Sequence, residues 1–248
     1  MKFRVCLLAA VLSISVATAA WAQDRWTGFY VGGNIGGAFG TSDVTTGPSN
    51  DTYFDPDNLP VVAGAGKGSI STTGFTGGGQ AGYNMQSGNL VFGGEVGFGV
   101  LDLDGSRTAA NVHYLSGCCT FTINESVKTN WLLTVRPRIG WAFGPSNSWL
   151  VDVSAGLALT DLKSSSRFAD APGGVMESAS KSEIKAGWTV GTSLAYGLDD
   201  HWSAKLEYLF VDFGGVSSSG TSNHLGQAFG HTADLTAHVV RAVVNYKF

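Results

Sequence analysis

The chain has 248 residues, of which 35 are glycine and only 14% are charged, and its formal net charge is −4. An acidic balance argues against nucleic acid as a partner, because phosphate backbones are bound by lysine and arginine. Beyond the N-terminal segment there is no run of about 18 apolar residues, so we expect no membrane-spanning helix.

The N-terminus has the pattern of a secretory signal. Lys2 and Arg4 precede an uncharged apolar stretch, and small residues stand before a cleavage point after Ala22. We therefore predict a signal peptide over residues 1–22. The single remaining domain, residues 23–248, is expected to fold after export.

Eight segments of this domain show the period-2 alternation of β-strands. In each of them the large apolar side chains share one parity, and glycine, small polar residues and isolated charges share the other. In chain order the segments are 28–39, 75–85, 90–100, 131–143, 149–160, 184–196, 202–210 and 240–248. Pro137 falls on the apolar side of the fourth, where the missing donor predicts a bulge or a local gap.

The composition of the two faces separates a barrel from a soluble sandwich. A sandwich turns its polar face to water, where Lys, Glu and Asp would be abundant and glycine scarce. Here the second face consists mostly of Gly, Ala, Ser and Thr, which suits a cramped interior. Aromatic side chains near the strand ends indicate an interfacial girdle. These are Trp26, Trp149, Tyr196 and Trp202.

Short and long connections alternate along the chain. The short ones are 87–89, 144–148 and 197–201, and the long ones are 41–73, 105–125, 164–182 and 214–234. All long connections therefore leave one rim, and both ends of the domain lie at the other. The predicted fold is all-β: an eight-stranded antiparallel up-and-down transmembrane β-barrel with short periplasmic turns and four long extracellular loops.

Parity directs several charged side chains into this barrel. Buried charges are costly unless they are paired, so we expect one lumen charge network. Its members are Glu95, Arg136, Arg138, Asp152, Lys185, Lys205, Glu207 and Arg241. The network is either a static plug or a gate that passes small ions, and the narrow bore of eight strands favours the plug.

Both ends of the predicted domain resemble a known family. The opening strand, Trp26 to Gly37, and the closing segment, Val240 to Phe248, are similar to the porin-like, OmpA-like outer-membrane β-barrels of the alphaproteobacterial immunogenic protein group. The resemblance implies a cell outer membrane location, contact with lipids and lipopolysaccharide, and folding through periplasmic chaperones and the barrel-assembly machinery. The alternate residues Val244, Tyr246 and Phe248 match the terminal assembly signal.

The predicted loops carry the remaining chemistry. Cys118 and Cys119 indicate a redox or disulfide role more than a metal site with His113, because the spacing does not suit tetrahedral ligands. His224 and His231 lie in the last long loop, and His238 lies at the start of the eighth strand. Haem or metal binding through these histidines is a weaker hypothesis than solvated side chains. The acidic stretch from Asp51 to Asp57 could hold calcium, but a solvated loop is favoured because EF-hand spacing is missing.

Together these observations predict a non-enzymatic surface protein without cofactor or metal, whose role is structural. No nucleophile and base are grouped on either rim. A small passive-diffusion porin is the alternative, and an adhesin or haem-binding receptor that uses the extracellular loops is the second alternative.

Overall fold

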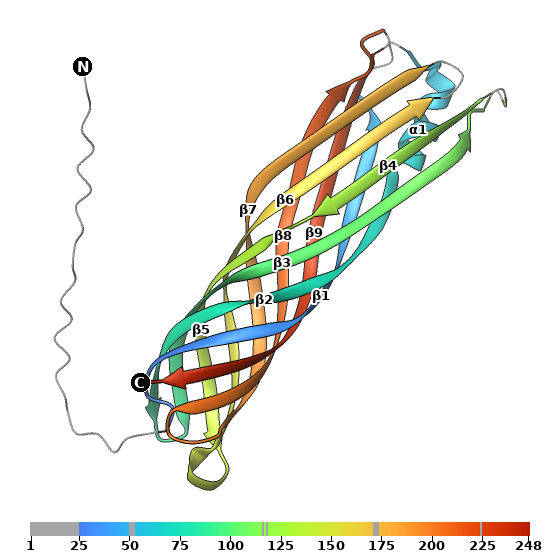
Figure 1. Ribbon diagram of the computed structural model, residues 1–248. Coiled ribbons are helices and arrows are strands. Elements are labelled where there is room, and N and C mark those ends of the chain that lie inside the picture. Colours follow the sequence, from blue (N-terminus) through green and yellow to red (C-terminus); the bar gives the residue numbers. More distant parts are fainter. Residues whose placement is uncertain (1–24, 50–52, 116, 118, 171–173, 224) are drawn as a thin grey trace, which may run out of the picture.

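The computed structural model describes residues 25–49, 53–115, 117, 119–170, 174–223 and 225–248. These residues form a long, tilted barrel, with the C-terminus at one end and a short helix at the other (Figure 1). The predicted signal peptide lies outside the described residues. The strands are β1 Gly28–Pro48, β2 Lys67–Ser87, β3 Leu90–His113, β4 Thr120–Lys128, β5 Trp131–Phe143, β6 Trp149–Asp170, β7 Val175–Gly197, β8 Trp202–Thr221 and β9 Ala228–Lys247.

The barrel is an antiparallel ring of eight strand positions. With β4 and β5 counted as one position, each strand pairs with the strand before it and the strand after it in the chain, and β1 closes the ring by pairing with β9. β4 and β5 together fill one position, since β3 pairs with β5 over Leu90–Val100 and with β4 over Asp104–His113. Thr129 holds the junction between them, because its Oγ1 donates to the Leu101 carbonyl at 2.7 Å.

The strands are much longer than the sequence segments that predicted them. A strand needs about 9 to 11 residues to cross a membrane at a tilt, whereas β3 has 24 residues and β6 has 22. Residues 41–48, 67–73 and 105–113 were expected in loops, and the structure places them in strands. The four long connections do leave one end of the barrel, but sheet makes up most of the length of three of them and nearly half of the first.

Two short helices lie at the end from which the long connections leave. These are the 3-10 helix η1 Pro56–Asn58 and the helix α1 Leu59–Ala65. At the opposite end, the 3-10 helix η2 Pro145–Asn147 forms the turn between β5 and β6. No helix of the described residues is long and apolar enough to cross a membrane.

The outer wall carries an apolar belt on the half of the barrel near the short turns. Its large side chains face outward and are 36–73% exposed. The belt includes Phe29, Ile35, Phe39, Phe75, Phe98, Val100, Trp141, Val153, Leu157, Trp188, Leu206 and Val244. Such an outward band is the surface that hydrocarbon chains cover in transmembrane barrels.

Beyond the belt, strands such as β3 exchange the chemistry of their two faces. On β3, Phe98 and Val100 are exposed outside, but the next outward residues, Asp102 and Asp104, are charged. Leu101, which faces the lumen between them, is fully buried. Directly beyond the belt, the wall of β3 is therefore polar outside and apolar inside, as in a water-soluble barrel.

Glycine on the inner face allows the strands to pack closely. A Cβ on Gly36 would lie 2.1 Å from the Val240 carbonyl oxygen, and one on Gly74 would lie 1.6 Å from that of Asp102. Real side chains cannot approach backbone atoms so closely. The inner glycines of β1 and β2 are therefore required by the tight curvature of this wall.

Candidate functional site

The lumen contains a buried ionic network at the level of the apolar belt. Four basic and three acidic side chains from β3, β5, β6, β8 and β9 meet there, and each is at most 8% exposed. The members of this ionic network are Glu95, Arg136, Arg138, Asp152, Lys205, Glu207 and Arg241. The structure thus brings together seven of the eight residues that strand parity directed inward.

Glu95 is the centre of the ionic network. Arg136 Nη2 lies 2.6 Å from its Oε1, and Lys205 Nζ lies 2.9 Å from its Oε2. Glu207 is the second centre, because Arg241 Nε donates to its Oε2 at 2.6 Å and Lys205 Nζ to its Oε1 at 3.0 Å. Every carboxylate has a cation beside it, which offsets the cost of burying the charges.

Neutral polar side chains complete the network. The Tyr30 hydroxyl donates to Glu95 at 2.8 Å and accepts from Arg138 Nη1 at 3.0 Å. Arg138 also pairs with Asp152, and Ser193 Oγ donates to the same carboxylate at 2.5 Å. These bonds fix the rotamers of the charged groups, as expected of a connected buried network.

Lys185 is not part of the ionic network, which corrects the assignment made from parity. It lies far along β7, where Trp188 and Ile184 end the apolar belt, and its Nζ pairs with Glu183 at 3.4 Å. Parity gives the face of a residue but not its height along a strand. Lys185 faces the inside at a level where the side chain reaches water.

An apolar layer fills the lumen directly beyond the ionic network. Its aliphatic and aromatic side chains come from β1 to β6, β8 and β9 and are 0–4% exposed. The largest members are Ile70, Leu101, Leu103, Leu132, Leu162, Leu209, Phe213 and Leu235. The sequence prediction missed this layer because it expected a polar interior throughout. The signal was present as apolar residues of inner parity, such as Leu101 and Leu103.

A second polar layer follows beyond the apolar layer. Thr46 Oγ1 donates to Glu125 Oε1 at 2.5 Å and lies 3.0 Å from His231 Nδ1. His231 Nε2 lies 3.3 Å from Glu177 Oε1, and Arg107 pairs with Glu125 at 3.0 Å. Because Thr46 gives its hydrogen to Glu125, His231 Nδ1 must donate to Thr46. The contact between His231 and Glu177 then needs a proton on one of the two groups.

His231 lies in a strand and not in a loop. The sequence prediction placed it in the connection 214–234, whereas the structure places it in β9 with 4% exposure. His238 faces outward at the upper margin of the belt, where it stacks on Phe39 and contacts the Tyr208 hydroxyl at 2.7 Å. The two histidines are thus on opposite faces of β9.

An aromatic cap closes the barrel at the end where α1 lies. It consists of Phe54, Val62, Tyr114, Phe121, Ile123, Phe168, Val175 and Phe229. Tyr53 and Tyr114 both donate to Asp170 Oδ2, at 2.7 and 3.2 Å. Burial and this carboxylate raise the pKa of Tyr53 to about 12, and they also raise the pKa of Tyr114.

The opposite mouth is closed by Trp26, which corrects its assignment to the interfacial girdle. Trp26 is 8% exposed, packs on Val91, Ala142 and Leu150, and donates from Nε1 to the Asn147 carbonyl at 2.8 Å. The indole fits the mouth of the barrel because it precedes β1 and can fold inward. The remaining predicted girdle residues, Trp149, Tyr196 and Trp202, lie outside and are 36–46% exposed.

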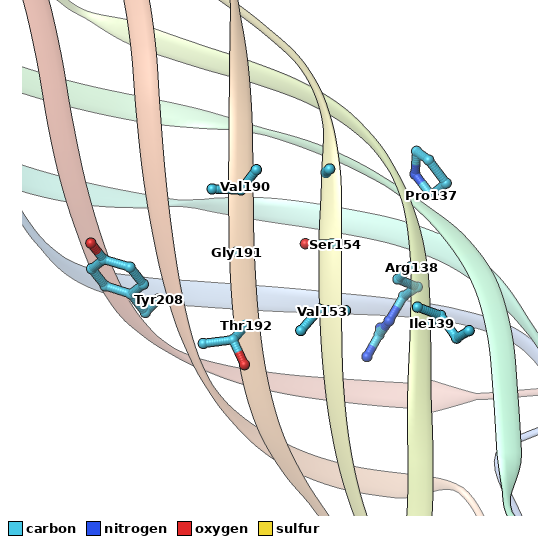
Figure 2. Close-up of a pocket in the computed structure, with 10 residues that line it drawn as sticks. Pro137, Arg138, Ile139, Val153, Ser154, Val190, Gly191, Thr192 and Tyr208 are labelled. Atoms are coloured by element: carbon cyan, nitrogen blue, oxygen red, sulfur yellow. The ribbon is translucent and has the colours of Figure 1, made fainter.

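A shallow apolar groove of about 660 Å³ crosses the belt over β5, β6, β7 and β8. Pro137, Ile139, Val153, Val190 and Tyr208 line it (Figure 2). The pairing of β5 with β6 skips Arg136 and Pro137 without a change of register. Pro137 therefore produces the predicted local gap and no bulge between these strands.

Several sequence hypotheses concern the capping end of the barrel. Cys118 lies outside the described residues, and Cys119 is disulfide-bonded. His224 and Asp51 also lie outside the described residues. Asp55 accepts from the Asp57 N–H at 3.1 Å and caps η1. Among the described residues, no three His, Cys, Asp or Glu side chains are placed to hold a metal ion.

The last strand places the predicted assembly signal on the outer wall. Val244 is 49% exposed, Phe248 is 73% exposed, and the Tyr246 ring packs against Trp202 at 5.1 Å between centroids. All three face the side that contacts the surroundings of the barrel. Recognition by the assembly machinery remains a prediction for these residues.

Several known proteins are similar to this chain. The chain is 30% identical to the 31 kDa outer-membrane immunogenic protein of Brucella melitensis, over 99% of this chain and 95% of that protein. It is 27% identical to the 22 kDa outer membrane protein of Rhizobium leguminosarum, over 76% of this chain and 64% of that one. The crystal structure of the outer membrane protein OprG from Pseudomonas aeruginosa covers 90% of this chain and 96% of its own, with 13% identity and a TM-score of 0.45.

Residues 6–248 match the family model described as the outer membrane protein beta-barrel domain. With this match and the Brucella relative, the chain belongs to the outer-membrane β-barrel family, within the alphaproteobacterial outer-membrane protein group.

Proposed function

We propose that this protein is a closed outer-membrane barrel with a structural and surface-display role, and that it conducts no solutes. The observation that carries the proposal is the apolar layer. Leu101, Leu103, Leu209 and Leu235 are 0% exposed inside the ring. Ions cross such a layer only if it is rearranged, because a charge is strongly disfavoured in a dry apolar medium.

The apolar layer is one of five barriers in series. Along the inner face of β9, Arg241 of the ionic network is followed by Leu235 of the apolar layer, His231 of the second polar layer and Phe229 of the cap. Trp26 closes the other mouth. A passive-diffusion pore would need all of these to open together, and this disfavours the porin alternative.

A single-channel recording in planar lipid bilayers tests the proposal. The refolded protein is expected to give no conductance steps, while a known porin added to the same bilayer gives them. Glu95→Ala should also remain silent, because the apolar layer closes the lumen independently of the ionic network. Steps in the wild-type protein that scale with salt would refute a closed barrel.

We also propose that the protein performs no catalysis. The contacts of Thr46 with His231 and of His231 with Glu177 have the order of a nucleophile, a base and an orienting acid. However, the Thr46 hydrogen is engaged by Glu125, and the three side chains are 1–4% exposed between the apolar layer and the cap. Among the described residues, these three side chains are almost completely shielded from solvent. Incubation with ester and peptide substrates should give no turnover above that of a Thr46→Val variant.

Attachment to an external ligand is the second candidate. A polar groove of about 450 Å³ lies beyond the belt, where its lining includes Ser106, Asn124, Arg167 and Ser178. Hydroxyl, amide and guanidinium groups suit a hydroxylated ligand, and display outside the cell supports it. Binding to immobilised glycans that Arg167→Ala and Ser178→Leu both abolish would favour attachment, and equal binding by all three proteins would count against it.

A further inference from the structure

The ionic network carries an excess positive charge. Among the described residues it contains Arg136, Arg138, Lys205 and Arg241, opposed by the carboxylates of Glu95, Asp152 and Glu207, so that 4 − 3 leaves a charge of +1. The apolar layer and the Trp26 cluster bound this level on its two sides. An uncompensated charge in such a position is expensive, because little water is available to solvate it.

Several buried polar atoms of the ionic network and its surroundings make no hydrogen bond to any described residue, among them Arg136 Nε and Gln80 Oε1. Two others lie beside the same glycine: Arg241 Nη2, a donor, and Thr134 Oγ1, which can donate. Arg241 uses its Nε for Glu207. Arg241 and Thr134 are 5% and 1% exposed. Unsatisfied buried donors are rare in folded proteins, and an ion or a water molecule bound beside them is one explanation.

Both atoms face the bare Cα of Gly97. A Cβ at this glycine would lie 3.1 Å from Thr134 Oγ1 and 3.9 Å from Arg241 Nη2. The third neighbour of that position is the Gly79 carbonyl oxygen, also at 3.9 Å. Gly97 thus leaves a cradle with a cationic donor on one side and a hydroxyl on another. We define the Gly97 cradle by Gly97, Thr134 and Arg241.

We propose that the Gly97 cradle binds a small monovalent anion such as chloride. The anion accepts from Arg241 Nη2 and from the Thr134 hydroxyl, and its charge brings the ionic network to neutrality. A water molecule would satisfy the two donors but would leave the charge of +1. The inference concerns the interior of the barrel and is independent of whether the proposed surface role is correct.

Bromide provides a direct probe, because it replaces chloride and scatters anomalously. Crystals of the refolded full-length domain grown in sodium bromide should show an anomalous peak in contact with Arg241 Nη2 and Thr134 Oγ1. Ordinary density at the cradle with no anomalous signal would identify water and overturn the proposal. A peak only on the exterior of the barrel would show an adventitious ion only, and it would also overturn the proposal.

Thermal unfolding provides a second test that needs no crystal. Protein refolded in sodium chloride should have a higher Tm than protein refolded in sodium gluconate at equal ionic strength, and the difference should saturate with chloride, because a ligand that binds only the folded state stabilises it. In Gly97→Asp the carboxylate occupies the cradle, so the dependence on chloride should disappear. An unchanged dependence in that variant would overturn the proposal.

Gly94→Ala is the matched control. Gly94 lies on the same strand, and a Cβ there meets nothing within 4 Å. This variant should keep the full chloride dependence, whereas Gly97→Ala, which narrows the cradle, should reduce it. If Gly97→Asp does not fold, the comparison of these two alanine variants decides: equal chloride dependence in both would refute the anion site.

Discussion

The substitution Glu95→Gln is the sharpest test of the ionic network. It keeps the shape of the side chain and removes one buried negative charge, so that the network changes from 4 − 3 to 4 − 2 and its net charge from +1 to +2. Glu95 accepts hydrogen bonds from Tyr30, Gln80, Arg136 and Lys205 within 2.6–3.3 Å. All of these donors would face a neutral amide.

The expected loss in the free energy of unfolding is about 3–5 kcal/mol, the range for breaking a buried ion pair from one side. Summing the separate hydrogen bonds at about 1.5–3 kcal/mol each would overestimate the effect, because networks are not additive. A second substitution, Lys205→Met, removes one of the two cations that contact both Glu95 and Glu207. In the double variant the count is 3 − 2, and the net charge returns to +1.

The free energy can be measured by urea titration of protein refolded into lipid vesicles, followed by tryptophan fluorescence. The double variant should be more stable than Glu95→Gln alone, with a coupling energy of about 0.5–3 kcal/mol. Asp102→Asn is the control, since this carboxylate is exposed and lies 3.9 Å from Lys128. A loss of less than about 1 kcal/mol for Glu95→Gln would show that the network carries no net restraint, and the reasoning would fail.

Three further predictions concern the other layers. Leu101→Ala should lower the free energy of unfolding by about 2–5 kcal/mol, because Leu101 is fully buried; a loss below about 1 kcal/mol in the same urea titration would show a loosely packed lumen. Val153→Arg within the belt should cost about 2–4 kcal/mol in vesicles, while Ser180→Arg beyond it should be neutral, and equal costs would misplace the belt. Because the folded-state pKa of Tyr53 is raised from 10.0 to about 12, its contribution to the cap is complete below pH 10 and is lost as pH rises through 12. Amide hydrogen exchange in α1 should accelerate between pH 10 and about 12 in the wild-type protein. The acceleration should be smaller in Tyr53→Phe, which has no hydroxyl to ionise at this position.

The sequence predicted the ring of eight strands because lipid and lumen impose opposite chemistry on alternate residues. On β5, Trp141 and Ile139 face outward and Arg138 and Arg136 face the lumen, as the alternation requires. The same parity brought seven charged residues to one network. Parity could not give the height of each residue, since this depends on strand stagger, and Lys185 was therefore assigned to a network that it does not reach.

The half of the barrel beyond the belt was harder to predict. There the large apolar side chains lie on the inner face of the strands, whereas within the belt they lie on the outer face. Residues 120–128 were divided between a predicted loop and no element, yet they form β4, in which Phe121, Ile123 and Val127 are buried inside. The sequence prediction looked for large apolar side chains on the outward face of each strand. It therefore stopped at the edge of the belt and missed the strand residues beyond it. Trp26 shows a related limit, because an aromatic residue near a strand end can turn into the mouth of the barrel as readily as toward lipid.

The point at which the apolar side chains change from the outer face to the inner face marks a position along each strand. A strand that leaves the hydrocarbon core exchanges lipid for water on its outer face, while its inner face must still bury apolar surface to hold the ring together. The apolar parity should therefore switch at the membrane boundary, as it does between Val100 and Leu101 on β3 and between Leu159 and Leu162 on β6. The boundary can thus be located on each strand from sequence alone once the parity of the first half is known. In this protein that switch also predicts closure, because apolar side chains of inner parity from neighbouring strands meet inside a ring too narrow to leave a channel between them.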